Sequence, residues 1–175
     1  MTEAVAYRAI MSVKPKTKYE YYVVSEGKEP IKSALYSFQS QPAKAPGKFQ
    51  VFAYGDSKSE YHVSNEVNGF LWQNIQDSQA AGKNPAFIVQ MGDFGSVGAI
   101  LEYEAWFNYG RTKSYTQTLL AQFPFLAVHG NHEGLLPTFY NTFDFPANGL
   151  TGWPAIKENG DKYYSYNYGK AHFVV

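Results

Sequence analysis

The stretch Phe125-Leu126-Ala127-Val128-His129-Gly130-Asn131-His132-Glu133 joins a short apolar run to a glycine and then to polar side chains. The same arrangement occurs twice upstream, where residues 49–54 run into Gly55-Asp56 and residues 87–91 run into Gly92-Asp93. Asp93 follows Asp56 by 37 residues, and Asn131 follows Asp93 by 38. Each interval has the length of a strand, a crossover helix and the return to a parallel strand. The spacing therefore predicts an α/β fold with a mainly parallel sheet.

The strand ends also carry the side chains that could bind a ligand or take part in catalysis. Parallel strands bring their carboxyl ends to one edge of a sheet, and open α/β sheets bind ligands there. Asp56, Asp93, Asn131 and His132 would then share that edge. Carboxylate and carbonyl oxygens are the ligands that hard divalent cations prefer. One Gly-Asp pair alone usually marks a turn or a helix cap, so the predicted metal site depends on the three strand ends together.

Composition excludes several classes of protein. Lysine plus arginine number 15, as do aspartate plus glutamate, so charge gives no argument for a nucleic-acid partner. The chain has no cysteine, which excludes a disulfide framework and a thiolate metal site. No apolar run reaches about 18 residues, so we expect no membrane-spanning helix. Residues 1–8 also lack the apolar core of a signal peptide.

The predicted secondary structure differs between the two parts of the chain on either side of a short linker. Residues 1–41 are typical of β structure, with strands predicted at 19–24 and 34–38. Residues 42–48 contain two prolines and a glycine, which indicates an interdomain linker. From residue 49, strands alternate with helical patterns.

Three helices and two further strands are predicted in this second part. The first helix would end near Ala81-Gly82 and bury an apolar face made of Val63, Val67, Phe70, Leu71 and Ile75. Residues 101–109 and 115–123 are also helical candidates. A loop is expected from residue 134 to about 161, followed by strands at 163–168 and 171–175. Because the chain stops inside the last of these strands, we expect it to be truncated.

Gly55-Asp56, Gly92-Asp93 and Gly130-Asn131-His132-Glu133, in this order on strand ends, resemble the calcineurin-like metallophosphoesterases. Residues 15–23, Tyr36-Ser37-Phe38 and the proline-rich linker are similar to the end of the fibronectin-type-III-like domain that precedes the catalytic domain of purple acid phosphatases. Residues 164–169 and 172–174 are similar to that family's strand pair after the Gly-Asn-His-Glu loop.

The resemblance implies a domain organisation. Residues 1–41 would be a partial fibronectin-type-III-like β domain, that is, part of a β-sandwich, and residues 42–48 would be the linker. Residues 49–175 would be the N-terminal half of the metallophosphoesterase domain, whose complete fold is a four-layer α/β/β/α sandwich.

The resemblance also implies a role for each site residue. Asp56 would ligate a first metal ion, Asp93 would bridge two, and Asn131 would ligate the second. His132 would contact phosphate and assist the leaving-group oxygen. The implied cofactors are two divalent or trivalent metal ions, chosen from Fe, Zn, Mn or Mg. The implied function is hydrolysis of small phosphate monoesters by this binuclear centre, as in acid phosphatases, and full-length relatives suggest a secreted or periplasmic location.

The sequence departs from the family pattern at two positions. Lys58 stands where many metallophosphoesterases have histidine and purple acid phosphatases have glycine. Ser96 stands where purple acid phosphatases have tyrosine. The Gly-His-x-His element that supplies further ligands does not occur in the chain, so we expect those ligands in a missing C-terminal half of the catalytic domain.

Two alternatives stay open: a non-catalytic binding module with a degenerate phosphoesterase-like domain, and a phosphodiesterase of the same superfamily. An ordinary nucleotide-binding α/β domain is disfavoured, because neither glycine-rich phosphate motif occurs.

Overall fold

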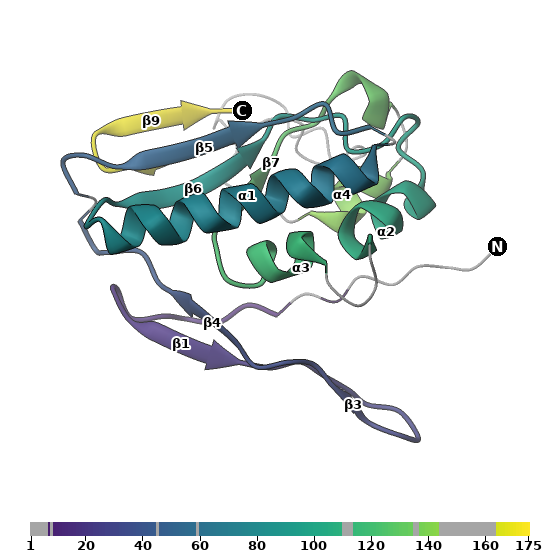
Figure 1. Ribbon diagram of the computed structural model, residues 1–175, viewed down its shortest axis with the longest axis horizontal. Coiled ribbons are helices and arrows are strands. Elements are labelled where there is room, and N and C mark those ends of the chain that lie inside the picture. Colours follow the sequence, from purple (N-terminus) through teal and green to yellow (C-terminus); the bar gives the residue numbers. More distant parts are fainter. Residues whose placement is uncertain are drawn as a thin grey trace, which may run out of the picture.

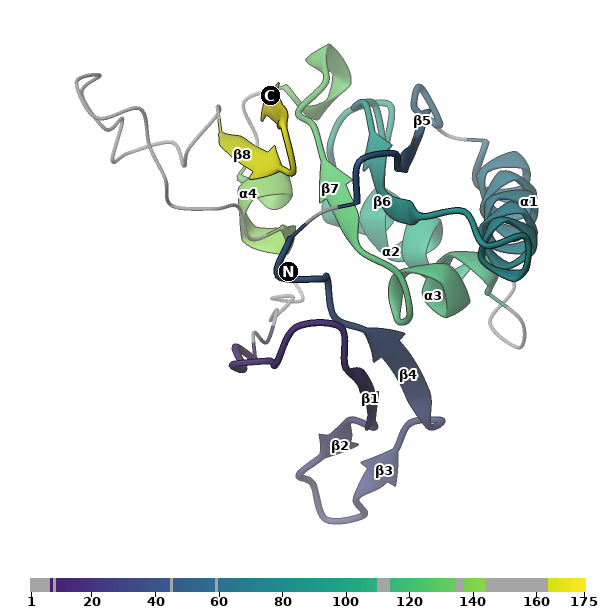
Figure 2. The same ribbon diagram turned by 90° about the vertical axis from the view of Figure 1, so that its left-hand side faces the viewer.

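A computed structural model describes residues 7, 9–44, 46–58, 60–109, 114–134, 137–143 and 164–175 of the chain. It contains a parallel three-stranded sheet with helices against one face and a β-hairpin against the other (Figures 1 and 2). An antiparallel β-ribbon precedes the sheet in the sequence and lies beside α3 (Figure 1). The mixed α/β architecture predicted from the strand spacing is therefore confirmed.

The sheet has the order β5–β6–β7, formed by Gln50–Tyr54, Pro85–Gln90 and Phe125–Ala127. Tyr54 pairs with Gln90, and Gln90 pairs with Ala127, so the three strands end at the same level. β6 lies in the middle and is the most buried strand, which explains its nearly continuous apolar sequence. The residues that follow each strand consequently meet at one edge of the sheet.

Three helices pack beside one face of this sheet (Figure 2): α1 (Tyr61–Ala80), α2 (Ile100–Asn108) and α3 (Tyr115–Leu120). The three predicted helical segments are confirmed, although α3 ends at Leu120 rather than at residue 123. The helix breaker Gly110, between α2 and α3, lies outside the described residues.

The buried face of α1 agrees with the prediction only in part: Ile75 is buried and Leu71 packs against the same cluster. Val63 and Phe70 are 48% and 69% exposed. The buried residues are Ser64, Asn65, Asn68, Ile75 and Ser78. Hydrogen bonds explain why polar side chains are buried here: Asn68 Nδ2 donates to Thr116 Oγ1 at 2.8 Å, and Asn65 Oδ1 accepts the first backbone N–H of α3 at 2.9 Å. Burial of the Asn68 amide nitrogen and the Asn65 amide oxygen is tolerated because each has a hydrogen-bond partner on α3.

The opposite face of the sheet is covered by the hairpin of β8 (Ser165–Tyr168) and β9 (Ala171–Val174), as Figure 2 shows. Phe87 of β6 contacts the rings of Tyr166 and Phe173 edge-on, with centroids 5.4 and 5.1 Å apart. The next residue, Ile88, packs in a buried cluster with Ile75 of α1 and Leu119 of α3. The predicted strand pair is thus confirmed, apart from residue 163, which lies outside the described residues.

The N-terminal ribbon is less continuous than predicted. β1 (Lys18–Tyr21) pairs with β4 (Tyr36–Gln39), and the short strands β2 (Val24–Ser25) and β3 (Ile31–Lys32) extend the ribbon. The predicted strand over 19–24 is interrupted because the Ser33 hydroxyl, rather than a backbone carbonyl, accepts the Val23 N–H at 2.9 Å. Serine side chains compete with strand ladders in this way.

Two contacts fasten the ribbon and the following residues to the α/β part. The Tyr21 hydroxyl donates to the carbonyl of Ala121 at 2.7 Å, and Gln41 Nε2 donates to the carbonyl of Ala86 at 2.8 Å. Apart from Ala45, which lies outside the described residues, residues 42–48 form neither helix nor strand. The predicted division at residues 41 and 49 and the four-layer sandwich stay predictions.

A 3₁₀ turn, η1 (Asn131–Glu133), directly precedes the stretch predicted to be a loop, and that stretch contains a short helix, α4 (Thr138–Thr142). The loop prediction is therefore wrong for α4. Its five residues are too few to show a helical period, and Phe139 anchors them in the cluster of Phe94, Tyr103 and Trp106. Residues 144–163 lie outside the described residues. Among the described helices, none combines the length and apolar character needed to cross a bilayer.

Candidate functional site

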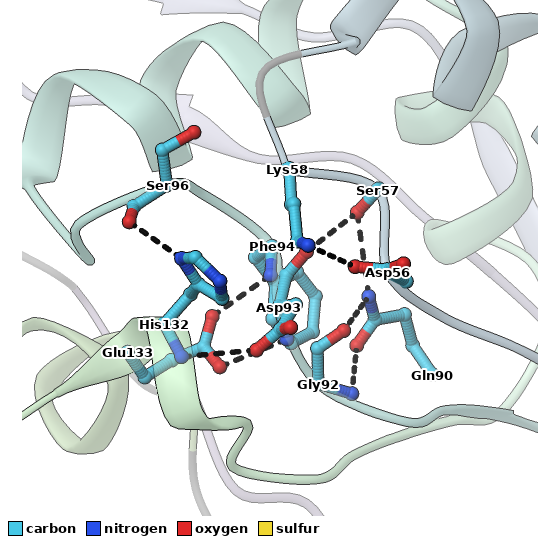
Figure 3. A network of polar contacts seen from close by, with 10 residues as sticks. All are labelled: Asp56, Ser57, Lys58, Gln90, Gly92, Asp93, Phe94, Ser96, His132 and Glu133. Atoms are coloured by element: carbon cyan, nitrogen blue, oxygen red, sulfur yellow. Dashed lines mark hydrogen bonds and ion pairs between the residues drawn. The ribbon is translucent and has the colours of Figure 1, made fainter.

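Backbone hydrogen bonds join the loops that follow β5 and β6. The N–H of Asp56 donates to the carbonyl of Gly92 at 3.0 Å, and the N–H of Lys58 donates to the carbonyl of Asp93 at 2.8 Å. The hydroxyl of Ser57, a buried side chain between them, also donates to the carbonyl of Asp93 at 3.3 Å. These bonds fix the two predicted aspartates relative to each other (Figure 3).

Both aspartates have an unusual backbone conformation. The φ angles are 58° at Asp56, 39° at Lys58 and 59° at Asp93, all in the left-handed region. Only a few per cent of non-glycine residues adopt positive φ, although Asp is enriched there. Such strain concentrates at functional sites. Its occurrence in two adjoining loops supports the assignment of this edge as the functional site.

The loops after β6 and β7 approach each other at two glycines. A Cβ atom on Gly92, whose φ is 89°, would lie 2.6 Å from the backbone N and Cα of Gly130. A Cβ atom on Gly130 would overlap Oδ1 of Asp93. Glycine is therefore required at both positions, and the approach brings the Gly-Asn-His-Glu segment against Asp93.

Glu133 binds these two loops together with a buried carboxylate. Its side chain is 1% exposed. Oε2 accepts the N–H groups of Gly130 and Asp93 at 2.6 and 2.9 Å, and Oε1 accepts the N–H of Phe94 at 2.8 Å. Tyr103 donates its hydroxyl to Oε1 at 3.4 Å, and burial together with the charge of Glu133 raises the pKa of Tyr103. Glu133 is thus the residue that sets the spacing between Asp93 and the loop after β7.

Gln90 supports the same turn from inside the sheet. Its fully buried side chain accepts the Gly92 N–H at 2.9 Å and donates to the Gly92 carbonyl at 3.0 Å. The sequence prediction assigned no role to Gln90 or Glu133. A glutamate three residues after Gly130 has the spacing of a capping box, which was the signal available for Glu133. A single buried glutamine leaves no comparable pattern.

His132 is held in place by bonds to two neighbouring loops. Its backbone N–H donates to Oδ1 of Asp93 at 3.0 Å, and its ring Nδ1 lies 2.8 Å from the backbone carbonyl of Ser96. A carbonyl oxygen can only accept, so Nδ1 carries the hydrogen. The other ring nitrogen, Nε2, is then the atom available for proton transfer. Ser96 contributes its backbone carbonyl to the site, as the acceptor for the His132 ring.

Glu102 orders the loop that presents this carbonyl. Its carboxylate accepts the backbone N–H groups of Ser96, Val97 and Ala99 at 2.8, 3.1 and 3.0 Å. Burial alone would raise the pKa of the Glu102 carboxyl, but these backbone donors outweigh burial and lower it. The loop from Ser96 to Ala99 is therefore stabilised by the ionised form of Glu102.

Asp56 lies at the exposed side of the site. Its side chain is 71% exposed, and Nζ of Lys58 lies 3.0 Å from its Oδ1. The side chain of Asn131 is also at the surface. The structure thus brings the loops of all four predicted residues, Asp56, Asp93, Asn131 and His132, to one edge, while their roles stay predictions.

The donor set fits a hard cation only in part. Within the described residues, no group of three or more His, Cys, Asp or Glu side chains is placed to hold a metal ion. The candidate ligands Asp56, Asp93 and Asn131 supply oxygen atoms, which suit hard cations. Asp93 and Asn131 carry oxygen atoms of this kind, and Oδ1 of Asp93 already accepts the His132 N–H, whereas Oδ1 of Asp56 has the Lys58 ammonium beside it.

The other three histidines contact residues that are not part of the candidate site. His62 lies at the start of α1, 3.6 Å from Glu60, with a side chain that is 60% exposed. His129 stacks on the ring of Tyr140, and His172 bonds to the Asn167 side chain at 2.7 Å. None of the three was assigned a role from the sequence.

Comparisons with known proteins support the fold. No family model matches the chain, and no curated protein matches it. Among solved structures, a purple acid phosphatase isolated from yellow lupin (Lupinus luteus) seeds is similar over 93% of this chain, with a TM-score of 0.61 and 15% sequence identity. The chain spans 30% of the length of that protein. Structural similarity at this identity supports a metallophosphoesterase-like fold.

Proposed function

We propose that the edge formed by the loops after β5, β6 and β7 hydrolyses phosphate monoesters with the help of bound metal, in the manner of an acid phosphatase. The observation that carries this proposal is the position of Asp93. Its carbonyl accepts the Lys58 N–H, its Oδ1 accepts the His132 N–H, and its N–H donates to Glu133. One residue, through its backbone and its carboxylate, therefore connects all three strand-end loops.

Asp93 and Asn131 would hold the metal through oxygen atoms, with Asp56 as a further candidate. A bound cation would lower the pKa of a water molecule and neutralise phosphoryl charge. His132 would donate a proton from Nε2 to the leaving-group oxygen, while the Ser96 carbonyl keeps the ring oriented. The substrate would be a small phosphoester, and the metals would come from Fe, Zn, Mn or Mg.

The oxygen donors alone leave any cation with few protein ligands. We therefore also propose that nitrogen ligands come from a C-terminal half of the catalytic domain outside residues 1–175, as the resemblance implies. Residues 1–41 would belong to a fibronectin-type-III-like domain. The expected binuclear centre would need Asp56 as a ligand of one metal ion. Because Asp56 is paired with Lys58, this pairing affects how many metal ions the site would hold.

The ion pair between Lys58 and Asp56 favours a second candidate, a non-catalytic module that binds phosphate groups without hydrolysing them. In such a module the lysine charge would replace metal altogether. The two candidates differ in whether hydrolysis is observed and in whether it depends on metal.

The test is hydrolysis of 4-nitrophenyl phosphate by the full-length polypeptide, with Mn²⁺, Zn²⁺ or Fe³⁺ added after chelation. We expect metal-dependent turnover that Asp93→Asn strongly reduces and that the control Asp77→Asn leaves unchanged. Asp77 is an exposed residue of α1 that bonds to Gln73, away from the strand ends. Absence of metal-dependent turnover supports the binding module instead. Preference for bis(4-nitrophenyl) phosphate would indicate a phosphodiesterase.

A further inference from the structure

Lys58 and Asp56 form an ion pair at the position where the resemblance places a metal ion. Their Nζ and Oδ1 atoms are 3.0 Å apart, and the lysine side chain is 41% exposed (Figure 3). The other two ion pairs found among the described residues are longer, at 3.8 and 3.6 Å. This carboxylate therefore already has a cation beside it.

The backbone fixes both partners of the pair. Lys58 is held by its N–H bond to the carbonyl of Asp93, and Asp56 by its N–H bond to the carbonyl of Gly92. Both have positive φ angles, 39° and 58°. The turn places the Lys58 ammonium beside the carboxylate of the aspartate two residues earlier, with both side chains open to solvent.

A metal ion on Asp56 Oδ1 would lie within a few ångströms of the lysine charge, and two positive charges at that separation repel each other strongly. We propose that the Lys58 ammonium takes the cation position at Asp56, so that the chain holds a single metal ion through Asp93 and Asn131 with a fixed lysine charge beside it. This inference rests on the proposed function, because it concerns the same sheet edge.

The consequence for the substrate is a mixed cationic site. An ammonium group neutralises a phosphoryl oxygen and donates up to three hydrogen bonds, but it does not polarise water as a metal ion does. Lys58 would thus bind the phosphoryl group, and the single metal ion would remain the only metal at this edge.

The experiment measures Mn²⁺ binding to the full-length polypeptide by equilibrium dialysis, with Mn²⁺ alone as the probe. The wild-type polypeptide should bind one equivalent at this site. Lys58→Met should gain a second equivalent or bind Mn²⁺ at least about tenfold more tightly, since it removes the neighbouring positive charge. Lys58→Arg, which keeps the charge, should behave like the wild type. Lys18→Met is the matched control, because it removes a lysine from the exposed pair with Glu20 in β1.

Two further variants keep the outcome decisive. Lys58→Gly removes the charge at a residue whose φ of 39° glycine adopts without strain, so it serves if Lys58→Met fails to fold. Asp93→Asn should lose Mn²⁺. Two equivalents bound by the wild type, or unchanged binding in both charge-removing variants, would overturn the role of Lys58 alone. Unchanged binding in Asp93→Asn would overturn the proposed metal site and leave the Lys58 result to be judged by its own variants.

Discussion

The backbone N–H of His132 donates a 3.0 Å hydrogen bond to Oδ1 of Asp93, so the loop after β7 is fixed on the carboxylate that follows β6. The ring of His132 is fixed separately, by the carbonyl of Ser96. A candidate proton donor and a candidate metal ligand therefore have a defined relative position, and substitutions at the two residues should have separable effects.

Asp93→Asn should reduce kcat/KM for an aryl phosphate by about 100-fold, the order found when one preorganised electrostatic group is removed from a site. Asp56→Asn should cost less, because Asp56 is exposed and already neutralised by Lys58. Steady-state kinetics at saturating metal compares the two. Equal losses, or a larger loss at Asp56, would contradict the central position of Asp93.

His132→Ala should lower kcat by about 10²–10⁴-fold, the usual contribution of a positioned general acid, and leave the metal content unchanged. Its ring would be bound to Ser96 rather than to metal. Metal analysis of the purified variant, together with turnover, decides between the two roles. His62→Ala is the control, since His62 is exposed on α1 and should leave both quantities unchanged. Loss of metal from His132→Ala would make His132 a ligand.

Glu133→Gln should lower the free energy of unfolding by about 3 kcal/mol, because a buried charged acceptor of three backbone N–H groups is replaced by a neutral amide. Urea denaturation measures the loss. Glu102→Gln is the matched control, since that carboxylate also accepts three backbone N–H groups but is less buried, so water can replace the lost bonds. A loss at Glu102 as large as the loss at Glu133 would contradict the importance of burial.

The lowered pKa of Glu102 predicts a dependence of stability on pH. Burial opposes ionisation, yet the backbone donors bring the folded-state pKa below its ordinary value of 4.5. The ionised carboxyl then adds stability above pH 4.5, and this stability is lost as pH falls through the folded-state pKa. Urea unfolding across this range should show a difference between wild type and Glu102→Gln that is constant above about pH 5 and shrinks below it. A difference that grows on acidification would reverse the sign of the shift.

The 175-residue chain alone should bind metal weakly and show no phosphatase turnover. Its candidate ligands at this edge are oxygen atoms only, whereas nitrogen ligands are what favour transition metals over Mg²⁺. Adding the proposed C-terminal half as a separate polypeptide should raise both metal affinity and turnover. Full activity of the chain without this addition would show that its own residues complete the site.

The strand ends were predictable because each one repeats the same pattern: an apolar run, a glycine and an oxygen-bearing side chain. The interval between Asp56 and Asp93 also predicted α1, since only a crossover helix fills that distance between parallel strands. These features depend on local sequence, and the structure confirms them.

Contacts between elements were not predictable from the same patterns. Asn65 and Asn68 are buried on α1 because α3, about 50 residues later, supplies their partners. The apolar pattern therefore identified Ile75 and Leu71 correctly but missed the buried polar residues of the helix and wrongly included Val63 and Phe70. Gln90 was missed for a related reason: its partners on the Gly92 backbone carry no residue-specific signal, whereas Glu133 offered only the capping-box spacing after Gly130.

Most of the hydrogen bonds that hold the three loops together at the sheet edge involve main-chain N–H and carbonyl groups, which nearly every residue type provides. Side chains can therefore drift widely during evolution without moving the loops, provided that Gly92, Gly130 and Glu133 are retained. Proteins that share this arrangement of loops should accordingly be recognised by superposing coordinates, with those three positions as markers.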